Sequence, residues 1–149
     1  MSDSLSGVWS AAVTPLFDDL TVDYLGMVAH FEWLLANGCD GVAALGTTGE
    51  ANSFTVGERL GVIEAAASSR IAKDKIMIGT GCCALPDTIE LTKAALDVGF
   101  HQILMLPPFY YKDVGNDALF SCFDYVIQKI GNSEMRVVVY DFPKMTGLE

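Results

Sequence analysis

The sequence GVAALGTTGE, residues 41–50, joins a short apolar run to a turn that has a glycine on each side of a threonine pair. The run Gly41–Leu45 predicts a buried strand. A helix is expected to follow from about Thr55 to Ile71, because Thr55 and Glu58 have the spacing of a capping box. A strand, a turn and a helix make one βα unit, so this stretch indicates an α/β fold.

The same alternation of strand and helix patterns continues along the rest of the chain. The other expected strands are Gly7–Val13, Lys75–Gly79, His101–Leu106 and Arg136–Tyr140, and the other expected helices run from Asp23 to Asn37, from about Pro86 to Val98 and from Asp117 to Ile130. Helices between successive strands require a parallel sheet, and no low-complexity linker divides residues 1–149, which indicates a single domain. Two architectures fit: a doubly wound open sheet, and an incomplete (β/α)8 TIM barrel, which needs about 250 residues when complete.

The composition predicts a folded protein and disfavours several classes of partner. Of the 149 residues, 51% are hydrophobic and 19% are charged, which is too apolar for a disordered chain. The net charge of −10 opposes binding to nucleic acid, which is a polyanion. No apolar run reaches the roughly 18 residues of a membrane span, and the first residues lack the pattern of a signal peptide. A cytoplasmic location is therefore expected.

Metal binding is not expected from the sequence. The four cysteines, Cys39, Cys82, Cys83 and Cys122, show no CxxC spacing, and the chain has only two histidines. A structural zinc site needs four cysteine or histidine ligands in a compact pattern. The cysteines are therefore interpreted as reduced packing residues.

The turn after the second expected strand is the first candidate binding site. Thr47 and Thr48 offer two hydroxyls, and the flanking Gly46 and Gly49 let several backbone N–H groups face one point, which suits a small carboxylate. The lysine of a phosphate-binding P-loop is missing, so nucleotide binding is disfavoured. An ordinary glycine-rich turn has the same spacing, and the residues alone leave both interpretations open.

Three tyrosines lie close to the ends of expected strands. Tyr110 and Tyr111 follow the fourth strand, and Tyr140 ends the fifth. The carboxyl ends of parallel strands meet at one edge of a sheet, so these phenols could form a proton relay with the threonine turn. The alternative is that they are core aromatics with satisfied hydroxyl groups.

Four strand-end motifs occur in order along the chain: Thr14-Pro15-Leu16-Phe17, Gly46-Thr47-Thr48-Gly49-Glu50, Pro108-Phe109-Tyr110-Tyr111 and Tyr140-Asp141-Phe142-Pro143. In this order and spacing they resemble the first five strand ends of the dihydrodipicolinate synthase and N-acetylneuraminate lyase family. The match covers essentially the whole chain, and the GTTGE segment is its most specific part. The resemblance implies a (β/α)8 TIM barrel, usually a homotetramer, of which this chain would be the N-terminal five-eighths.

The resemblance also implies a reaction, which is class I aldol addition or cleavage with pyruvate, or another 2-oxo acid, bound as a Schiff base. No metal or other cofactor is implied. Thr47 and Thr48, in the turn that Gly46 opens, would hold the pyruvate carboxylate, and Thr47 would also link two tyrosines. Tyr140 would be the acid/base. Tyr111, or the adjacent Tyr110, would be the tyrosine that one subunit lends to its neighbour.

The chain departs from the family pattern at three places. The Schiff-base lysine of the family lies on the sixth strand, which this chain does not reach. Met145 stands where the synthases carry an arginine for a second carboxylate, and Asp141 stands where asparagine is usual. Lys144 is the only lysine just past a strand end, and it is expected to be solvated, like the chain's other lysines, Lys73, Lys75, Lys93, Lys112 and Lys129.

These departures predict that the 149-residue chain is inactive alone and that its parent is a lyase or aldolase for an aldehyde other than that of the lysine pathway. Two hypotheses from other classes remain open. One is a non-catalytic open-sheet domain that binds a small anion at Gly46–Gly49. The other is a truncated paralogue that assembles with full-length barrels.

Overall fold

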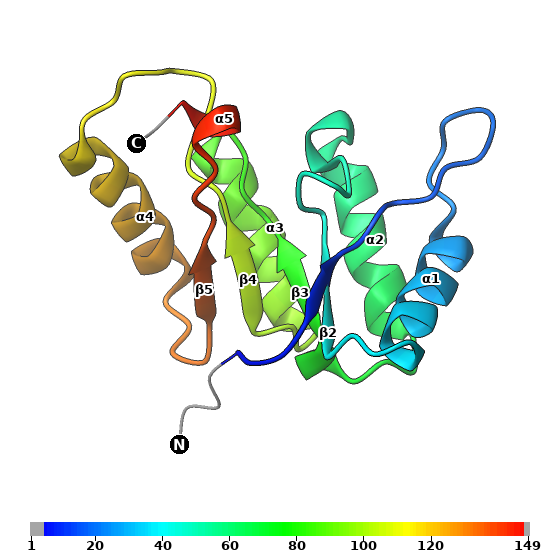
Figure 1. Ribbon diagram of the computed structural model, residues 1–149. Coiled ribbons are helices and arrows are strands. Elements are labelled where there is room, and N and C mark those ends of the chain that lie inside the picture. The colour runs from blue at the N-terminus through cyan, green and yellow to red at the C-terminus, as the bar shows by residue number, and fades with distance from the viewer. Residues whose placement is uncertain (1–4, 148–149) are drawn as a thin grey trace.

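The computed structural model describes residues 5–147, which form one curved parallel sheet with helices around it (Figure 1). The strands are β1 (Trp9–Ala11), β2 (Gly41–Ala44), β3 (Ile76–Gly79), β4 (Gln102–Met105) and β5 (Arg136–Val139). All four neighbouring pairs are parallel, and the order β1-β2-β3-β4-β5 follows the chain. A doubly wound sheet reverses its strand order at a switch point, and this sheet does not. The predicted incomplete barrel is therefore confirmed.

One helix follows each of the first four strands, as expected. The helices are α1 (Tyr24–Ala36), α2 (Val56–Ser68), α3 (Leu85–Asp97), α4 (Asn116–Ile130) and a short α5 (Pro143–Thr146), with two 3-10 turns at Ala51–Ser53 and Lys73–Lys75. In Figure 1, α2 and α3 lie behind the sheet, and α1 and α4 flank it. None of the helices within residues 5–147 has the length and apolar character that crossing a membrane requires.

Two helices begin with the capping bonds of a side chain, and one of them, the capping box of Thr55 and Glu58, was predicted from the sequence. The Asp23 carboxylate accepts the N–H of Gly26 at 2.8 Å. The Thr55 hydroxyl accepts the N–H of Glu58 at 3.2 Å, while the Glu58 carboxylate accepts the N–H of Thr55 at 2.8 Å. Both arms of the capping box are therefore present, and α2 begins where its sequence places it.

The core lies between the central strands and the helices. Val42, Ile76, Ile78 and Ile103 on the sheet are fully buried, and they belong to one cluster with Phe31 of α1, Val62 and Ile63 of α2 and Leu91 of α3. Every residue of β3 is buried, whereas β1 and β5 are partly exposed. Burial thus decreases from the centre of the sheet to β1 and β5, which are its two open edges.

The strands are one to four residues shorter than predicted, and two further differences have a clear physical reason. Helix α2 ends at Ser68 and not at Ile71, because Ser69 leaves the helical region with ψ of 169°. The chain after β5 was predicted only to break at Pro143, but it forms the single turn α5. Proline at the first helical position costs no hydrogen bond, and Gly147, at φ of 69°, ends the turn.

Candidate active site

The hydroxyls of Thr47 and Tyr140 lie 3.2 Å apart, although the residues are 93 positions apart in the sequence. Thr47 follows β2 and Tyr140 follows β5, so three strand spacings separate them in the sheet. In a flat sheet that separation is about 14 Å, which is too far for this contact. Curvature of the sheet therefore brings the two hydroxyls together at the carboxyl ends of the strands.

The turn 46–49 is shaped by close backbone packing. Leu45 and Glu50, on either side of it, have φ of 57° and 52°, and the N–H of Glu50 donates to the carbonyl of Thr47 at 3.1 Å. A Cβ on Gly49 would lie 2.9 Å from the carbonyl oxygen of Ala12, so no larger residue fits there without a shift. Gly46 meets no such restriction.

The predicted turn residues remain available to a ligand. Thr47 and Thr48 are exposed, and the Thr48 hydroxyl has no hydrogen bond within the described part of the chain. The structure therefore brings the Thr47 hydroxyl and the Tyr140 phenol, both able to donate, to one point, with the exposed Thr48 next in the turn. Such donors suit a carboxylate and a proton transfer beside it.

A small cavity of about 20 Å³ lies between the ends of β2, β3, β4 and β5. Its lining includes Thr47 and Tyr140, together with Asn52, Gly79 and Gly81, which the sequence analysis did not single out. A volume of this size holds about one water molecule. Pyruvate would therefore have to extend from this cavity onto the open side of the sheet.

Gly79 and Gly81 could have been noticed from their position at the end of a predicted strand. A Cβ on Gly79 would lie 2.0 Å from the carbonyl oxygen of Leu45, and one on Gly81 would lie 2.7 Å from the backbone nitrogen of Leu106. Both glycines thus allow neighbouring strand ends to touch. Asn52 carried no comparable signal, because it lies in a polar segment between two elements.

The structure does not bring Tyr110 or Tyr111 to the Thr47–Tyr140 pair. Their side chains are 74% and 76% exposed, and their rings contact each other edge to face at 5.2 Å. A relay of phenols from both loops within one chain is therefore not formed. Exposed phenols are free to enter a neighbouring subunit, so the lending of Tyr111 or Tyr110 stays a prediction.

Lys112 is exposed, as expected, and Lys73 is half-buried, but both ammonium groups are also held by carbonyl groups of the chain. The Lys112 ammonium donates to the carbonyls of Phe109, Met145 and Thr146 at 2.6, 3.0 and 3.0 Å. It ties the tyrosine loop to α5, because the last carbonyls of a helix attract a cation. Lys73 donates to the carbonyl of Ala67 and lies over the Phe100 ring. Lys144 is exposed, as expected.

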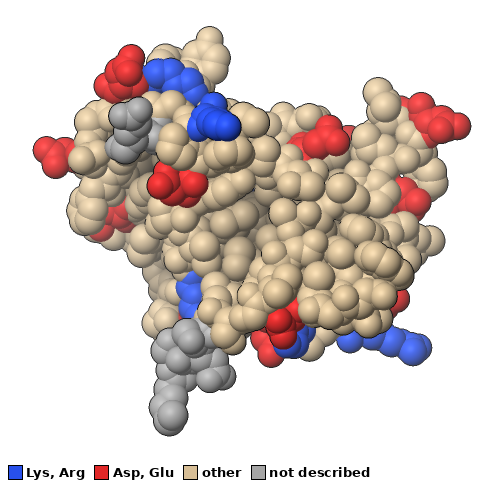
Figure 2. Space-filling model, viewed as in Figure 1, with Lys and Arg blue, Asp and Glu red and all other residues tan. Residues whose placement is uncertain are grey.

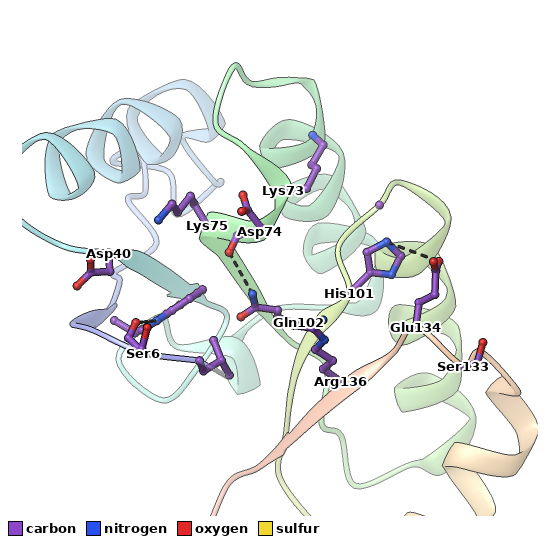
Figure 3. Close-up of a pocket in the computed structure, with 13 residues that line it drawn as sticks. Ser6, Asp40, Lys73, Asp74, Lys75, His101, Gln102, Ser133, Glu134 and Arg136 are labelled. Carbon is purple, nitrogen blue, oxygen red and sulfur yellow. Dashed lines mark hydrogen bonds and ion pairs between the residues drawn. The ribbon is translucent and has the colours of Figure 1, made fainter. Parts of the chain in front are cut away.

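A larger cavity, of about 780 Å³, lies at the other end of the sheet, where the strands begin (Figure 3). Its lining mixes both charges, including Asp40, Lys75 and Arg136. Figure 3 shows His101 facing Glu134, with Nε2 4.0 Å from the carboxylate. Parallel α/β barrels carry their chemistry at the carboxyl ends of the strands. We therefore place the candidate site at Thr47 and Tyr140, despite the smaller volume there.

Metal ligands are not gathered at either cavity. Within residues 5–147, no three histidine, cysteine, aspartate or glutamate side chains lie close enough together to hold an ion. The four cysteines are all free thiols.

Comparison with known proteins gives one consistent match. Residues 4–149 match the Dihydrodipicolinate synthetase family. The DapA-like lyase of Chloroflexus aurantiacus is 38% identical over 143 residues, which is 95% of this chain and 47% of that protein. The chain spans about half the length of the curated relatives it matches.

Solved structures show the same relationship. Dihydrodipicolinate synthase from Agrobacterium tumefaciens superposes with a TM-score of 0.89 at 37% identity, over 95% of this chain and 50% of that one. N-acetylneuraminate lyase from Proteus mirabilis gives a TM-score of 0.87 at 27% identity, over 99% of this chain and 49% of that one. The fold of residues 5–147 thus corresponds to the N-terminal part of these barrels.

Proposed function

Because the chain belongs to the dihydrodipicolinate synthetase family, a family of lyases, we propose that the whole protein is a class I aldolase that binds pyruvate, or another 2-oxo acid, as a Schiff base. The observation that carries this proposal is the 3.2 Å contact between the hydroxyls of Thr47 and Tyr140. Imine formation needs a proton donor beside the carbonyl carbon and fixed donors for the carboxylate. Tyr140, after β5, supplies the proton donor, and Thr47, after β2, supplies a donor for the carboxylate.

Each residue of the site then has a role. Thr47 and Thr48 bind the carboxylate through their hydroxyls and backbone N–H groups, in the turn that Gly46 opens. Tyr140 donates the proton that leaves with water when the carbinolamine dehydrates, and it recovers a proton through Thr47. Tyr111, or Tyr110, completes the relay from a neighbouring subunit of a homo-oligomer, a tetramer by family resemblance.

The nucleophile has to come from outside these 149 residues. Imine chemistry needs an amine beside the carboxylate site, with a pKa low enough to leave it neutral. Lys112 is held by three carbonyls, and Lys144 is exposed on α5. The sixth strand of the family's barrel carries the lysine, so this chain alone is expected to be inactive.

The aldehyde that reacts with pyruvate is expected to carry no carboxylate that binds at α5. Met145 offers no charge there, and its side chain is 52% exposed. A charge-assisted carboxylate contact is worth about 1.5–3 kcal/mol, so its absence disfavours a dicarboxylate product. The solved structures similar to this chain include both a dihydrodipicolinate synthase and an N-acetylneuraminate lyase, so the proposal of another, sugar-derived aldehyde rests on Met145.

The experiment uses a chain extended through the sixth strand, in which borohydride traps the pyruvate imine. Tyr140→Phe should slow trapping by roughly 10²–10⁴-fold, the contribution of a positioned acid or base. Tyr125→Phe, which removes the exposed phenol of α4, serves as the control and should leave the rate unchanged. Equal rates for Tyr140→Phe and the wild type would contradict the proposal.

A further inference from the structure

Arg59 is the only charged residue that is buried in residues 5–147, with 3% of its surface exposed. It belongs to α2, and its guanidinium reaches the loop after β3. Nη2 donates to the carbonyl of Gly79 at 2.9 Å, and both terminal nitrogens lie 3.4–3.5 Å from the carbonyl of Gly81. Nη1 also donates to Sγ of Cys82 at 2.9 Å. The Nε atom is buried without a partner.

No carboxylate of the described residues pairs directly with this buried charge. Within residues 5–147, no carboxylate oxygen lies within 4.0 Å of the Arg59 guanidinium, and Asp87, the acidic side chain that acts on this loop, makes no direct contact with it. Cys82 does not supply the missing charge: burial raises the pKa of its thiol, and the nearby guanidinium only partly offsets this. At neutral pH the thiol is therefore uncharged. A buried guanidinium compensated only by carbonyl dipoles is costly, and it attracts an anion strongly.

The carbonyls that Arg59 holds belong to the wall of the candidate site. Gly79 and Gly81 line the same cavity as Thr47 and Tyr140. Their backbone also packs directly on the end of β2, since a Cβ on Gly79 would clash with the carbonyl of Leu45. Arg59 thus holds this wall from the side opposite the cavity.

We propose that Arg59 is a positioning residue of the carboxylate site: it fixes the carbonyls of Gly79 and Gly81, and it places behind them a positive charge that no carboxylate pairs directly. This inference rests on the proposed function, because it takes the ligand to be a carboxylate. An arginine is suited to both tasks, since its planar fork can hold two carbonyls while its charge persists at every pH.

The test titrates the 149-residue chain with pyruvate and, separately, with its neutral analogue pyruvamide. Binding is followed by NMR from the backbone amides of Thr47 and Thr48. Arg59→Gln should weaken pyruvate binding about tenfold and change pyruvamide binding little, because only pyruvate carries the charge. Arg59→Lys keeps the charge and should stay within about threefold of the wild type. Cys82→Ala, which keeps both carbonyl contacts, is the matched control and should bind both ligands normally.

Hydrogen exchange at residues 79–83 tests the positioning role without any ligand. Both Arg59 variants should exchange faster there than the wild type and Cys82→Ala, because lysine cannot reproduce the fork. If Arg59→Gln does not fold, the exchange of Arg59→Lys alone tests the positioning role. Wild-type exchange in Arg59→Lys would overturn the positioning role. Equal losses for pyruvate and pyruvamide in Arg59→Gln, or no loss for either, would overturn the role of the charge.

The two measurements distinguish a failure of the proposed carboxylate site from a failure of the role of Arg59. If wild-type Thr47 and Thr48 amides do not respond to pyruvate, the proposed carboxylate site fails, and the role of the Arg59 charge fails with it. Faster exchange at residues 79–83 in the Arg59 variants would still support the fixing of the loop.

Discussion

The Thr14 hydroxyl donates a hydrogen bond to the carbonyl of Gly49 at 2.8 Å, across 35 residues of sequence. This bond fastens the end of β1 to the turn that carries Thr47 and Thr48. The backbone of the turn approaches so closely that a Cβ at Gly49 would also lie 3.3 Å from the same hydroxyl oxygen. The glycine and the threonine therefore form one structural unit, although they belong to different sequence motifs.

Gly49→Ala should destabilise the chain by about 1–3 kcal/mol, because the added methyl group meets the Ala12 carbonyl at 2.9 Å. Gly57→Ala is the control. Gly57 lies in α2, where a Cβ would meet only the Thr55 hydroxyl oxygen at 3.9 Å. That change should stabilise the chain by up to about 1 kcal/mol, as alanine does in a helix. Urea unfolding of the two variants checks the contrast, and equal effects would contradict this account of the turn.

The capping box predicts a pH dependence of stability. Hydrogen bonds from the backbone and hydroxyl of Thr55 lower the pKa of the Glu58 carboxyl below its usual value of 4.5. A lowered pKa in the folded state gives stability that is present above the unfolded value and lost as the pH falls through the folded one. The wild type should therefore lose stability relative to Glu58→Gln as the pH falls below about 4.5.

Glu64→Gln provides the comparison for this effect. Glu64 is exposed on the same helix, and its carboxylate accepts no hydrogen bond from the described residues. Its substitution should leave the pH profile of unfolding unchanged. A Glu58→Gln profile parallel to that of the wild type from pH 5 to pH 3 would show that the box does not contribute this stability.

The open edges of the sheet predict association in solution. β1 and β5 each pair on one side only, and Val8 and Val139 at these edges are 62% and 58% exposed. On the face shown in Figure 2, charged side chains lie around the margin and leave the middle uncharged. Unpaired apolar edges recruit other chains. Gel filtration of the 149-residue chain should show dimers or larger species, whereas a stable monomer would contradict this expectation.

Met145 predicts the substrate preference of the complete enzyme. Met145→Arg should improve turnover of aspartate semialdehyde, because a guanidinium can bind its carboxylate in a bidentate manner. The expected gain is about tenfold or more, which corresponds to the 1.5–3 kcal/mol of such a contact. Measuring kcat/KM for both forms checks this. Efficient turnover of aspartate semialdehyde by the unchanged enzyme would contradict the assignment to another aldehyde.

The parts of the fold that depend on short-range patterns could be predicted from the sequence. Thr55 and Glu58 specify the start of α2 through local bonds, and the apolar runs specify the five strands, because both depend on neighbours within a few positions. The strand-end motifs likewise located Thr47 and Tyr140. The convergence of parallel strand ends allowed a contact between them as one of two interpretations, and the family resemblance favoured it; the contact itself depends on the curvature of the whole sheet.

Other features depend on tertiary packing and were not predictable from local patterns. Arg59 in a helical sequence looks like a solvated charge, but α2 directs it under the loop after β3. Lys112 is exposed, as expected, but its bonds to the carbonyls of the short helix α5 could not be predicted from the sequence around it. Tyr110 and Tyr111 follow a strand end as Tyr140 does, yet their loop carries them away from the site.

The central claim is that the carboxylate turn and Tyr140 serve a Schiff-base lysine that lies beyond residue 149. Incubation with pyruvate and borohydride, followed by intact-mass measurement, tests it most directly. The 149-residue chain should keep its mass, and a chain extended through the sixth strand should gain one reduced pyruvate on the lysine of that strand. An adduct on the 149-residue chain, mapped to Lys144, would contradict the account, because the nucleophile would then lie on α5.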